Sequence, residues 1–422
     1  KEYRRQRQMC IRDRNNIMKP IVRAGRMKPV HSDIRGPLFV EAMKRQKQGI
    51  DILKLNTGNP ATFGFGLPDS IKNALIEHMQ DGVGYCDFKG MPQARQAICD
   101  YETSKGIKGI TSDDVFIGNG VSEVVSFALT PLLNDGDEVL VPSPSYSLWG
   151  NSVYLEDGKP VFYTCDEQAN WYPDIQDIRS KITDKTKAIV IINPNNPTGV
   201  LYPKELLLEI IQIARESGLL IFADEIYDRL VMDGKQHISL ASLTEDVPVI
   251  TLNGLSKSHC LCGYRCGWMV ISGPRELTED YRQGIIQLTS LRLCANTLAQ
   301  IVIPVALDDM DTPASMVRPG GRIYEQREAT VRELEKIDGL SFVKNDAAFY
   351  VFPKLDVKKF NITNDKQFAH DLLDATNILL VPGSGFDWKD PDHFRIVMLP
   401  QADILSDAIR RMGTFLDGYK QK

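Results

Sequence analysis

The sequence has no surplus of positive charge: 50 Lys and Arg stand against 55 Asp and Glu, which gives a formal net charge of −5. Proteins whose main partner is nucleic acid usually carry a basic excess that neutralises phosphates. We therefore expect no nucleic-acid partner. The composition also lacks the bias of a disordered chain, because 43% of the residues are hydrophobic and 25% are charged, as in ordinary folded proteins.

Long apolar runs and a regular cysteine framework are also missing. No run reaches the roughly 18–20 residues that a membrane-spanning helix needs, so we expect no membrane partner. The eight cysteines are irregularly spaced, which indicates reduced thiols in the cytoplasm rather than disulfides. Cys260, Cys262 and Cys266 form a C-x-C-x3-C run. A zinc site needs a fourth ligand, so we expect no metal there but small buried residues, whose role stays open.

The first seventeen residues lack the apolar segment of a secretory signal and show no apolar helical face. They are basic and contain no serine, which leaves a mitochondrial presequence as the weaker alternative. The stretch MCIRDR resembles a translated library adaptor. We therefore predict that residues 1–17 are a non-native or artefactual extension and that the natural start is Met18.

The length of the chain predicts more than one domain. A chain of 422 residues is too long for one ordinary hydrophobic core. We predict an N-terminal segment at 18–60 that joins the smaller domain, a large ligand-binding domain at 61–318, and a small C-terminal domain at 319–422.

The large domain is predicted to be α/β with a mostly parallel central sheet. Its predicted strands are short apolar runs at 115–118, 138–142, 188–193, 219–224 and 249–254. They are rich in β-branched residues and are separated by helix-length segments such as 204–218. Strands that are apolar on both faces are typical of parallel sheets covered by helices.

Other helices and strands are predicted on either side of these strands. A helix is expected at 70–80, with Asp69 or Ser70 as its N-cap. The C-terminal part predicts a smaller α+β unit. Its expected strands lie within 340–353 and 378–398, and its expected helices at 366–375 and 402–418.

Polar residues end four of the predicted strands: Asn119, Asn193, Asp224 and Asn253. In an open α/β sheet, ligands bind at the carboxyl ends of the strands. The sequence therefore predicts one site that collects residues from these four ends.

Lys257 follows the last of these strands, in LNGLSKSHCLCGYRCGW. A lysine at a strand end is usually a solvated surface residue. Here Ser256 and Arg265 offer anion-binding groups, and Gly263 and Gly267 allow close backbone approach. A lysine near cationic groups and partly removed from water has a lowered pKa and becomes a usable amine nucleophile. We therefore predict a lowered pKa and a catalytic role for Lys257.

Three further residues have two interpretations each. Asp224 in FADEIYDRL either caps a following helix or pairs with the protonated ring nitrogen of a cofactor. The Tyr227 hydroxyl either faces the same site or packs half-buried. Asn196 in NPNNPTGV either belongs to a simple turn or binds the phenolic oxygen of a cofactor, and only its combination with Asp224 and Lys257 is informative.

The segment GNGVSE at 118–123 follows a strand and opens a helix. Free backbone N–H groups and the helix dipole suit a phosphate there, and Ser122 can add a hydroxyl. As a dinucleotide fingerprint the segment fails, because Glu123 stands in place of the third glycine. A nicotinamide dehydrogenase is therefore disfavoured.

An aromatic and an arginine complete the candidates. Tyr146 in PSPSYSLW either stacks on a planar ring or covers the core. Arg395 in HFRIVML lies between apolar residues, where a buried cation needs an anion. Its partner is either a substrate carboxylate, held in a bidentate clamp, or an internal Asp or Glu.

Taken in order, these motifs resemble the class I/II family of fold-type I aminotransferases, which use pyridoxal 5′-phosphate (PLP). The resemblance covers roughly residues 30–420, and the ordered set is specific although each motif alone is weak. Within the family the sequence is similar to the bacterial glutamate–pyruvate (alanine) group. The stretches that carry this similarity include DIRGPL at 33–38, LKLNTGNPATFGF at 53–65, GYCDFKG at 84–90 and PGGRIYEQR at 319–327.

The resemblance implies a role for each residue around the cofactor ring. Lys257 carries PLP as a Schiff base, and Asp224 holds the pyridine nitrogen. Tyr227 and Asn196 hold the phenolic oxygen. Tyr146 stacks on the ring.

The resemblance also implies phosphate and substrate contacts. The residues implied for the phosphate are Val121, Ser122, Ser256 and Arg265. Those implied for the amino-acid substrate are Gly58, Asn196 and Arg395. Tyr85 reaches the phosphate of the partner subunit, so a homodimer with shared active sites is implied.

The implied reaction is ping-pong transamination: L-alanine and 2-oxoglutarate give pyruvate and L-glutamate through the Schiff base on Lys257. The alternatives on the same fold are an aminotransferase for aromatic or branched-chain amino acids and a PLP β-lyase. A non-catalytic effector domain of a transcription factor is disfavoured, because about 30 residues before DIRGPL leave no room for a DNA-binding domain. The arginine for the distal carboxylate of glutamate stays open between Arg35 and Arg292.

Two positions depart from the family pattern. Many relatives have a serine three residues before the lysine, where this chain has Gly254, so one phosphate hydroxyl is missing. The alanine group has a tyrosine just before DIRGP, where this chain has Ser32. The second departure bears on how the N-terminal segment closes over the substrate.

Overall fold

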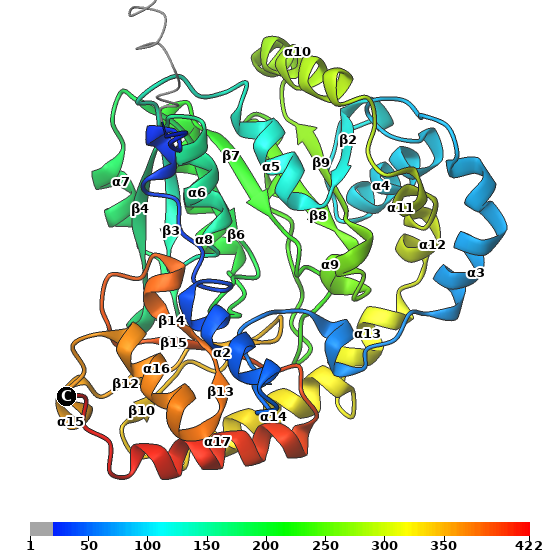
Figure 1. The fold of residues 1–422 in the computed structure, drawn as a ribbon. Helices are drawn as coiled ribbons and strands as arrows, with labels where there is room; N and C mark the ends of the chain where they lie inside the picture. The colour runs from blue at the N-terminus through cyan, green and yellow to red at the C-terminus, as the bar shows by residue number, and fades with distance from the viewer. Residues whose placement is uncertain (1–19) are drawn as a thin grey trace, which may run out of the picture.

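An eight-stranded sheet crosses the larger part of the computed structural model, which describes residues 20–422 (Figure 1). The predictions on residues 1–17 and Met18 lie outside the described residues. The strand order is β2-β9-β8-β7-β6-β3-β4-β5. In chain order the strands are β2 (Val115–Asn119), β3 (Glu138–Ser143), β4 (Lys159–Asp166), β5 (Tyr172–Pro173), β6 (Thr186–Ile192), β7 (Leu220–Asp224), β8 (Val249–Gly254) and β9 (Cys266–Ser272).

Most neighbouring strands in this sheet are parallel. Strands β4, β3, β6, β7 and β8 pair in parallel, β9 is antiparallel to both β2 and β8, and β5 is antiparallel to β4. The predicted α/β fold with a mostly parallel sheet is confirmed. All five predicted strands are present, with ends shifted by at most two residues, whereas β4, β5 and β9 were not predicted.

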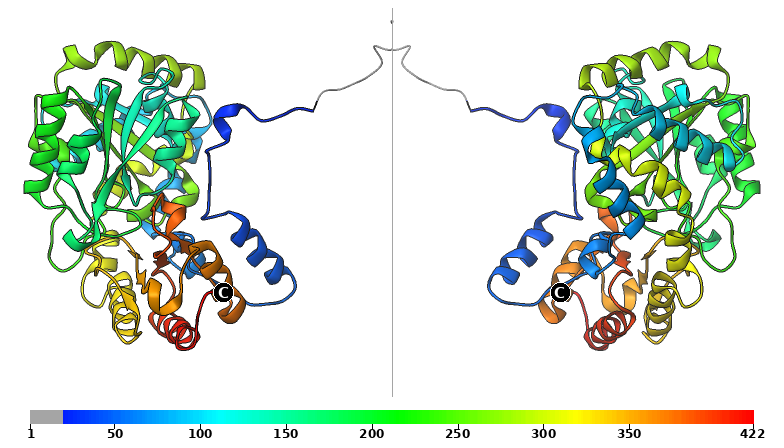
Figure 2. Two further views of the ribbon diagram at one scale, coloured as in Figure 1. Left: turned by 90° about the vertical axis from the view of Figure 1, so that its left-hand side faces the viewer. Right: turned by 90° about the vertical axis from the view of Figure 1, so that its right-hand side faces the viewer.

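Helices cover both faces of the sheet (Figure 2). They include α4 (Pro92–Ser104), α5 (Val121–Leu129), α6 (Leu148–Leu155), α7 (Ile175–Lys181), α8 (Lys204–Ser217), α10 (Arg275–Arg292), α11 (Thr297–Ile301) and α12 (Ile303–Asp308). Helices α5, α6 and α10 share a core with Val190 and Ile192, whereas α7 and α8 share one with Ile189 and Ile191. Because successive side chains of a strand point to opposite faces, a strand covered on both sides is apolar at every position.

The predicted helix at 70–80 is present as α3 (Asp69–His78), followed by the short turn η3 (Met79–Gly82). The predicted N-cap is wrong, because Pro68 occupies that position and no side chain caps the helix. Asp69 instead lies in the first turn, where its charge interacts favourably with the helix dipole. Among the described residues no single helix is long and apolar enough to cross a membrane, although one pair bent by 118° passes the same test together.

The C-terminal residues form a second group of helices and strands, most of which share one hydrophobic core. Its helices are α13 (Asp311–Val317), α14 (Arg322–Leu334), α15 (Val357–Phe360), α16 (Asp365–Thr376) and α17 (Ala402–Leu416), and its strands are β10 (Leu340–Ser341), β11 (Tyr350–Val351), β12 (Lys354–Leu355), β13 (Ile378–Leu379), β14 (Val381–Pro382) and β15 (Phe394–Val397). Leu55 joins this core, and β1 (Leu53–Lys54) pairs in parallel with β13. The predicted domain boundaries at 60/61 and 318/319 stay predictions.

The N-terminal segment connects the two parts of the molecule. Figure 2 shows it descending along the sheet-bearing part, through the turn η1 (Gly25–Met27), to α2 (Pro37–Lys47) beside the C-terminal elements. The backbone N–H of His31 donates to Asn151 Oδ1 of α6 at 3.1 Å. The His31 ring lies between two carboxylates, with Nε2 2.9 Å from Asp387 Oδ1 and Nδ1 3.4 Å from Asp33 Oδ2.

The His31 contacts predict a pH-dependent stability. Hydrogen bonds to Asp33 and Asp387 raise the pKa of His31 from 6.5 to about 9. Protonation therefore stabilises the folded state fully below pH 6.5, and this contribution is lost as the pH rises through about 9. We expect His31→Gln to lower the free energy of unfolding by about 1 kcal/mol at pH 6, after discounting for solvent screening, and by almost nothing at pH 10. Urea unfolding at both pH values measures this, and an equal loss at both would contradict it.

Candidate active site

Polar residues from the ends of β6, β7 and β8 lie together at one edge of the sheet. The backbone N–H of Asn193 donates to the Asp224 carbonyl at 3.0 Å, which holds the ends of β6 and β7 side by side. Lys257 lies in the short helix α9 (Leu255–Ser258), directly after β8. Its ammonium group donates to the carbonyl of Gly58 at 2.8 Å. The site that the strand ends form therefore also contains Gly58 of the N-terminal segment, which contacts Lys257.

The predicted lowering of the Lys257 pKa is wrong in this structure. Burial lowers the pKa, and so does the charge of Arg395. The nearby hydroxyl and thiol groups of Tyr350, Cys262 and Tyr146 outweigh both effects and leave the pKa above its ordinary value. The sequence suggested cationic neighbours only, because it gave Tyr350 no role and considered Cys262 only as a metal ligand.

Asp224 is a buried carboxylate, 5% exposed, that pairs with no cation among residues 20–422. Its Oδ2 accepts a hydrogen bond from Trp149 Nε1 at 3.0 Å, and its Oδ1 accepts one from the Ile226 backbone at 3.4 Å. Burial raises its pKa from 3.8 to about 6. The alternative that Asp224 caps a helix is wrong, because the residues that follow β7 form turns. A buried carboxylate of this kind is suited to a cationic ligand.

Arg395 has the opposite charge and the same lack of a charged partner. It lies in β15, is 1% exposed, and makes no ion pair with an Asp or Glu among the described residues, so the alternative of an internal carboxylate is wrong. Its Nη1 donates to Asn196 Oδ1 at 2.8 Å, and its Nη2 donates to the Asn56 carbonyl. Its Nε is buried without a partner. Burial lowers the pKa of Arg395, which an anionic ligand would offset.

Tyrosines connect these two charged residues. The hydroxyls of Tyr227 and Tyr350 lie 2.8 Å apart in the buried interior. The Tyr350 ring packs against the Arg395 guanidinium, with 4.5 Å between the guanidinium carbon and the ring centroid. Tyr146, which is 36% exposed, lies near enough to Lys257 and Arg395 to influence the pKa of both.

The start of α5 forms a candidate anion site. Val121 and Ser122 lie in its first turn, where backbone N–H groups have no helical carbonyl to bond. Gly120, with φ of 83°, places this turn against Arg265, because a Cβ on Gly120 would lie 2.2 Å from an Arg265 nitrogen. Ser256, next to Lys257, belongs to the adjacent helix α9. Backbone N–H groups, a helix N-terminus and a guanidinium together suit a phosphate.

Tyr85 makes no hydrogen bond or ion pair to another predicted site residue within the described residues. It lies in the loop after η3 and is 83% exposed. Its predicted role concerns a partner subunit, so a single chain does not test it.

The comparisons with known proteins agree with this geometry. The sequence pattern of the family described as aminotransferase class I and II matches residues 50–409. The chain belongs to the class I and II aminotransferases. This aminotransferase is 50% identical over 404 residues to the glutamate-pyruvate aminotransferase of Haemophilus influenzae, covering 96% of this chain and 100% of that relative. The predicted family is therefore confirmed.

Solved structures have the same fold as this aminotransferase. A crystal structure of an aminotransferase from Escherichia coli matches with a TM-score of 0.94 and 47% identity, covering 96% of this chain and 100% of that one. An alanine aminotransferase from Pyrococcus furiosus matches with a TM-score of 0.89 and 40% identity, covering 94% and 100%. The predicted fold-type I architecture is confirmed.

The sequence missed three residues of the aminotransferase site. Trp149 donates a hydrogen bond to Asp224, Tyr350 shares one with Tyr227, and the Asn56 carbonyl accepts one from Arg395. Trp149 had a weak signal, since a buried tryptophan needs an acceptor for its N–H and this one follows Tyr146 by three residues. Tyr350 had none, because only backbone structure was predicted for its segment. Asn56 lies two residues before Gly58 in the stretch 53–65 that carries the family similarity, but no pattern in that stretch singled it out.

The two arginines left open for the distal carboxylate differ in their surroundings. Arg292 forms an ion pair with Glu123 and donates to the carbonyl of Ile117, so most of its donors are engaged. Arg35 is exposed and makes no ion pair among residues 20–422. The structure therefore favours Arg35 as the arginine that remains available.

The three clustered cysteines do not converge on one point. Cys266 is buried in β9, the Cys260 thiol lies 3.8 Å from Met316 Sδ, and the Cys262 thiol donates to the Ser256 carbonyl at 3.0 Å. All seven described cysteines are free. Within the described range no group of three or more His, Cys, Asp or Glu is placed to hold a metal ion.

Proposed function

We propose that this aminotransferase holds PLP on Lys257 and transfers the amino group of L-alanine to 2-oxoglutarate, giving pyruvate and L-glutamate. One observation carries the proposal. The carboxyl edge of the sheet combines a lysine amine, a buried carboxylate without a cation (Asp224) and a buried guanidinium without an anion (Arg395). The choice of alanine is supported by the printed names of the relatives from Haemophilus influenzae and Pyrococcus furiosus.

The residues present fit PLP on both sides of the ring. Asp224 offers an anion to a protonated pyridine nitrogen. Burial raises its pKa, and a cationic ligand would offset this cost of burying the charge. Tyr227 and Asn196 offer hydrogen-bonding groups for the phenolic oxygen, and Tyr146 offers a ring face. Residues proposed for the phosphate are Val121, Ser122, Ser256 and Arg265. When bound, PLP supplies an electron sink for negative charge at the substrate Cα.

The protein contributes positioning and proton transfer. Arg395 and Asn196 bind the substrate α-carboxylate, and the Gly58 carbonyl lies beside the reacting amine. This grip orients the Cα–H bond, which selects transamination over decarboxylation. The Lys257 amine, once free of the cofactor, would serve as the base that takes the proton from the substrate Cα and as the acid that returns it. A 2-oxo acid leaves before the second one binds, so the kinetics are ping-pong.

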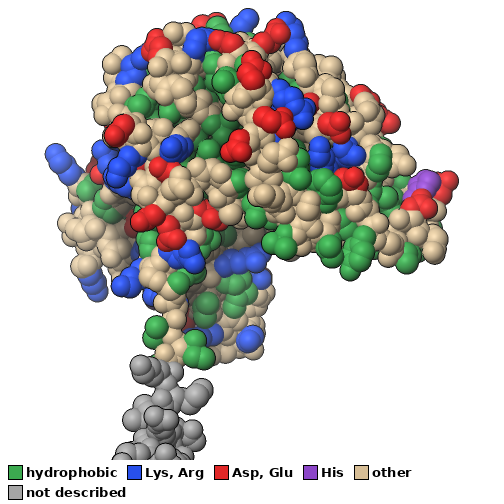
Figure 3. Space-filling view, turned by 90° about the horizontal axis from the view of Figure 1, so that it is seen from above, with side chains coloured by type: hydrophobic (Ala, Val, Ile, Leu, Met, Phe, Trp, Pro, Cys, Tyr) green, Lys and Arg blue, Asp and Glu red, His purple; other side chains and the backbone are tan. Residues whose placement is uncertain are grey.

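A homodimer with shared sites completes the proposal. Tyr85 lies in an exposed apolar patch that consists of Met79, Val83, Tyr85 and Leu298. Figure 3 shows hydrophobic side chains gathered along the right-hand edge of one face, the side on which α3 lies in Figure 1. An exposed patch of this kind typically marks a contact with another protein. Light scattering should give about twice the chain mass of 47.4 kDa.

The visible spectrum of the purified protein tests the function. We expect an absorption band that bleaches when L-alanine is added and returns with 2-oxoglutarate. Bleaching by L-phenylalanine or L-valine but not by L-alanine would support the aromatic or branched-chain alternative. Release of pyruvate and ammonia from cystathionine, with no 2-oxo acid added as amino-group acceptor, would support the β-lyase. A colourless protein after incubation with PLP would refute the proposal.

Arg395→Lys separates the two carboxylates of the substrates. Lysine keeps the charge of arginine and loses its planar fork. We therefore expect a fall in kcat/KM that corresponds to a loss of about 1.5–3 kcal/mol of transition-state stabilisation, for alanine and glutamate alike. Steady-state kinetics with both amino acids measure this. A loss confined to glutamate would place Arg395 on the distal carboxylate, and the α-carboxylate would then need another arginine such as Arg35.

A further inference from the structure

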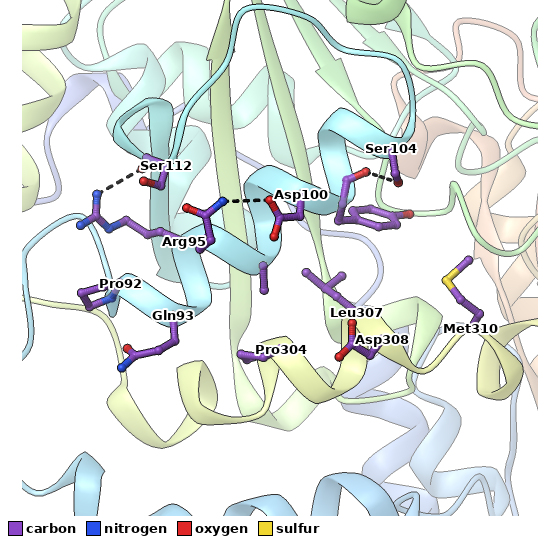
Figure 4. A pocket seen from close by; sticks show the side chains of 13 residues that line it. Pro92, Gln93, Arg95, Asp100, Ser104, Ser112, Pro304, Leu307, Asp308 and Met310 are labelled. Carbon is purple, nitrogen blue, oxygen red and sulfur yellow. Dashed lines mark hydrogen bonds between the residues drawn. The ribbon is translucent and has the colours of Figure 1, made fainter.

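A buried charge cluster lies behind the proposed site and is not used by the reaction. Its centre is Lys105, which follows α4. The Lys105 ammonium lies 2.8 Å from Glu102 Oε2, 2.8 Å from Glu225 Oε2 and 3.1 Å from Asp228 Oδ2. Figure 4 shows side chains of α4 and α12 that face each other across a groove of about 800 Å³. Tyr101 also lines this groove and donates to Asp228 Oδ2 at 2.6 Å.

The cluster contains more carboxylates than its single lysine can neutralise. Glu102 is completely buried, and Glu225 and Asp228 are nearly so. Burial alone would lower the pKa of Lys105, but attraction to the three carboxylates outweighs it and raises the pKa well above its ordinary value. Removing the lysine would leave buried carboxylates without a cation, which is strongly destabilising. Lys105 therefore holds two chain segments together, the end of α4 and the turn at 225–228 that follows β7.

One of these segments leads directly to Lys257. Asp228 Oδ2 accepts a hydrogen bond from Asn253 Nδ2 at 2.8 Å. Asn253 Oδ1 in turn accepts one from the Gly254 backbone at 2.7 Å. These bonds fix the end of β8, three residues before Lys257.

The same turn begins beside Asp224, and hydrogen bonds link it to the segment that contacts the loop of Asn196. Glu225 follows Asp224, and its Oε1 accepts hydrogen bonds from Ser239 Oγ at 2.9 Å and from the Leu240 backbone at 3.0 Å. Close to Ser239, His237 Nε2 donates to the Asn193 carbonyl at 3.0 Å, at the start of the loop that bears Asn196. The cluster thus contacts the ends of β7 and β8 directly and is linked to the end of β6 through residues 237–240.

We propose that Lys105, Asp228 and Asn253 are positioning residues that set the relative placement of the three loops bearing Asn196, Asp224 and Lys257. The inference rests on the proposed function of these loops. None of the three positioning residues belongs to the set proposed to hold the cofactor or the substrate. They act because a small displacement of the reacting groups is enough to slow the chemistry by about 100-fold.

The test compares Asn253→Ala with Lys105→Met and a matched control. For Asn253→Ala we expect kcat to fall by about 10- to 100-fold, with KM for alanine within about threefold. Hydrogen exchange at residues 254–257, measured on the protein freed of PLP, should rise by at least about tenfold. For Lys105→Met we expect the same pattern with exchange also raised at 193–196, and Lys105→Arg should restore kcat. If Lys105→Met does not fold, Asn253→Ala decides.

The control is Arg282→Met, which removes another buried ion pair. Arg282 Nη1 lies 2.6 Å from Asp114 Oδ1, and neither residue touches the three loops. This variant should lower Tm and leave kcat and exchange at 254–257 unchanged. If Asn253→Ala behaves like this control, the cluster is only structural and the inference is wrong. A failure of the proposed function would differ, since borohydride would then fix PLP to a peptide without Lys257.

Discussion

Replacing Lys257 by alanine should abolish transamination while the protein still folds. The amine is proposed both to hold the cofactor and to carry the proton, so the variant loses two functions at once. Proton transfer by a positioned group is worth about 10²–10⁴-fold on its own, and we therefore expect kcat to fall by more than about 10⁴-fold. The fold should survive, because within residues 20–422 the ammonium group makes a single hydrogen bond, to the Gly58 carbonyl.

Two measurements make this result interpretable. Circular dichroism should show an unchanged fold, and Lys358→Ala, on the exposed surface of α15, should retain full activity. Borohydride reduction of the wild type should fix PLP to a single peptide that contains Lys257. A fixed peptide from elsewhere in the chain, or a Lys257→Ala variant that still turns over, would contradict the assignment.

Asp224→Ala is expected to separate activity from stability. Without the carboxylate the pyridine nitrogen loses its proton. We therefore expect a fall in kcat that corresponds to a barrier raised by about 3–4 kcal/mol, while PLP stays bound. Absorbance and steady-state kinetics on the same sample measure both. Near-normal turnover would show that the carboxylate is not needed and would refute its role.

The same substitution should not destabilise the protein without cofactor. Folding raises the pKa of Asp224 from 3.8 to about 6, so its charge costs the folded state stability as the pH rises through this range. At pH 7 that cost is about 3 kcal/mol. Its removal offsets the roughly 1–3 kcal/mol lost when Trp149 Nε1 is left unpaired. We expect the Tm at pH 7 to stay level or rise, and Asp224→Asn, which keeps an acceptor for Trp149, to raise it further.

The sequence predicted the strands of the sheet better than their arrangement. The run at 188–192 is apolar at every position because helices cover both faces of the sheet, and these residues lie in β6. Strand β9 was missed, since it lies among glycines and cysteines. No local pattern indicates that it inserts antiparallel between β2 and β8. Strand order depends on contacts between distant segments, which the spacing of apolar residues does not encode.

The same limit applies to the candidate site. Asp224 and Lys257 were predictable because each directly follows an apolar strand, and parallel strands end at one edge. Tyr350 and Asn56 were not, because their bonds to Tyr227 and Arg395 join residues 123 and 339 positions apart. The pKa of Lys257 was predicted in the wrong direction for this reason, since Tyr350 is among the groups that raise it.

The long reach of Arg395 also sets an order of events during protein synthesis. Its partner Asn56 precedes it by 339 residues, so at about 5–20 residues per second roughly 17–70 s separate the two on the ribosome. Every residue proposed to hold the cofactor is made before Arg395. A growing chain therefore contains all residues proposed to bind the cofactor before it contains Arg395, which is proposed to bind the amino acid. Each new molecule is expected to be inactive until Arg395 has been synthesised.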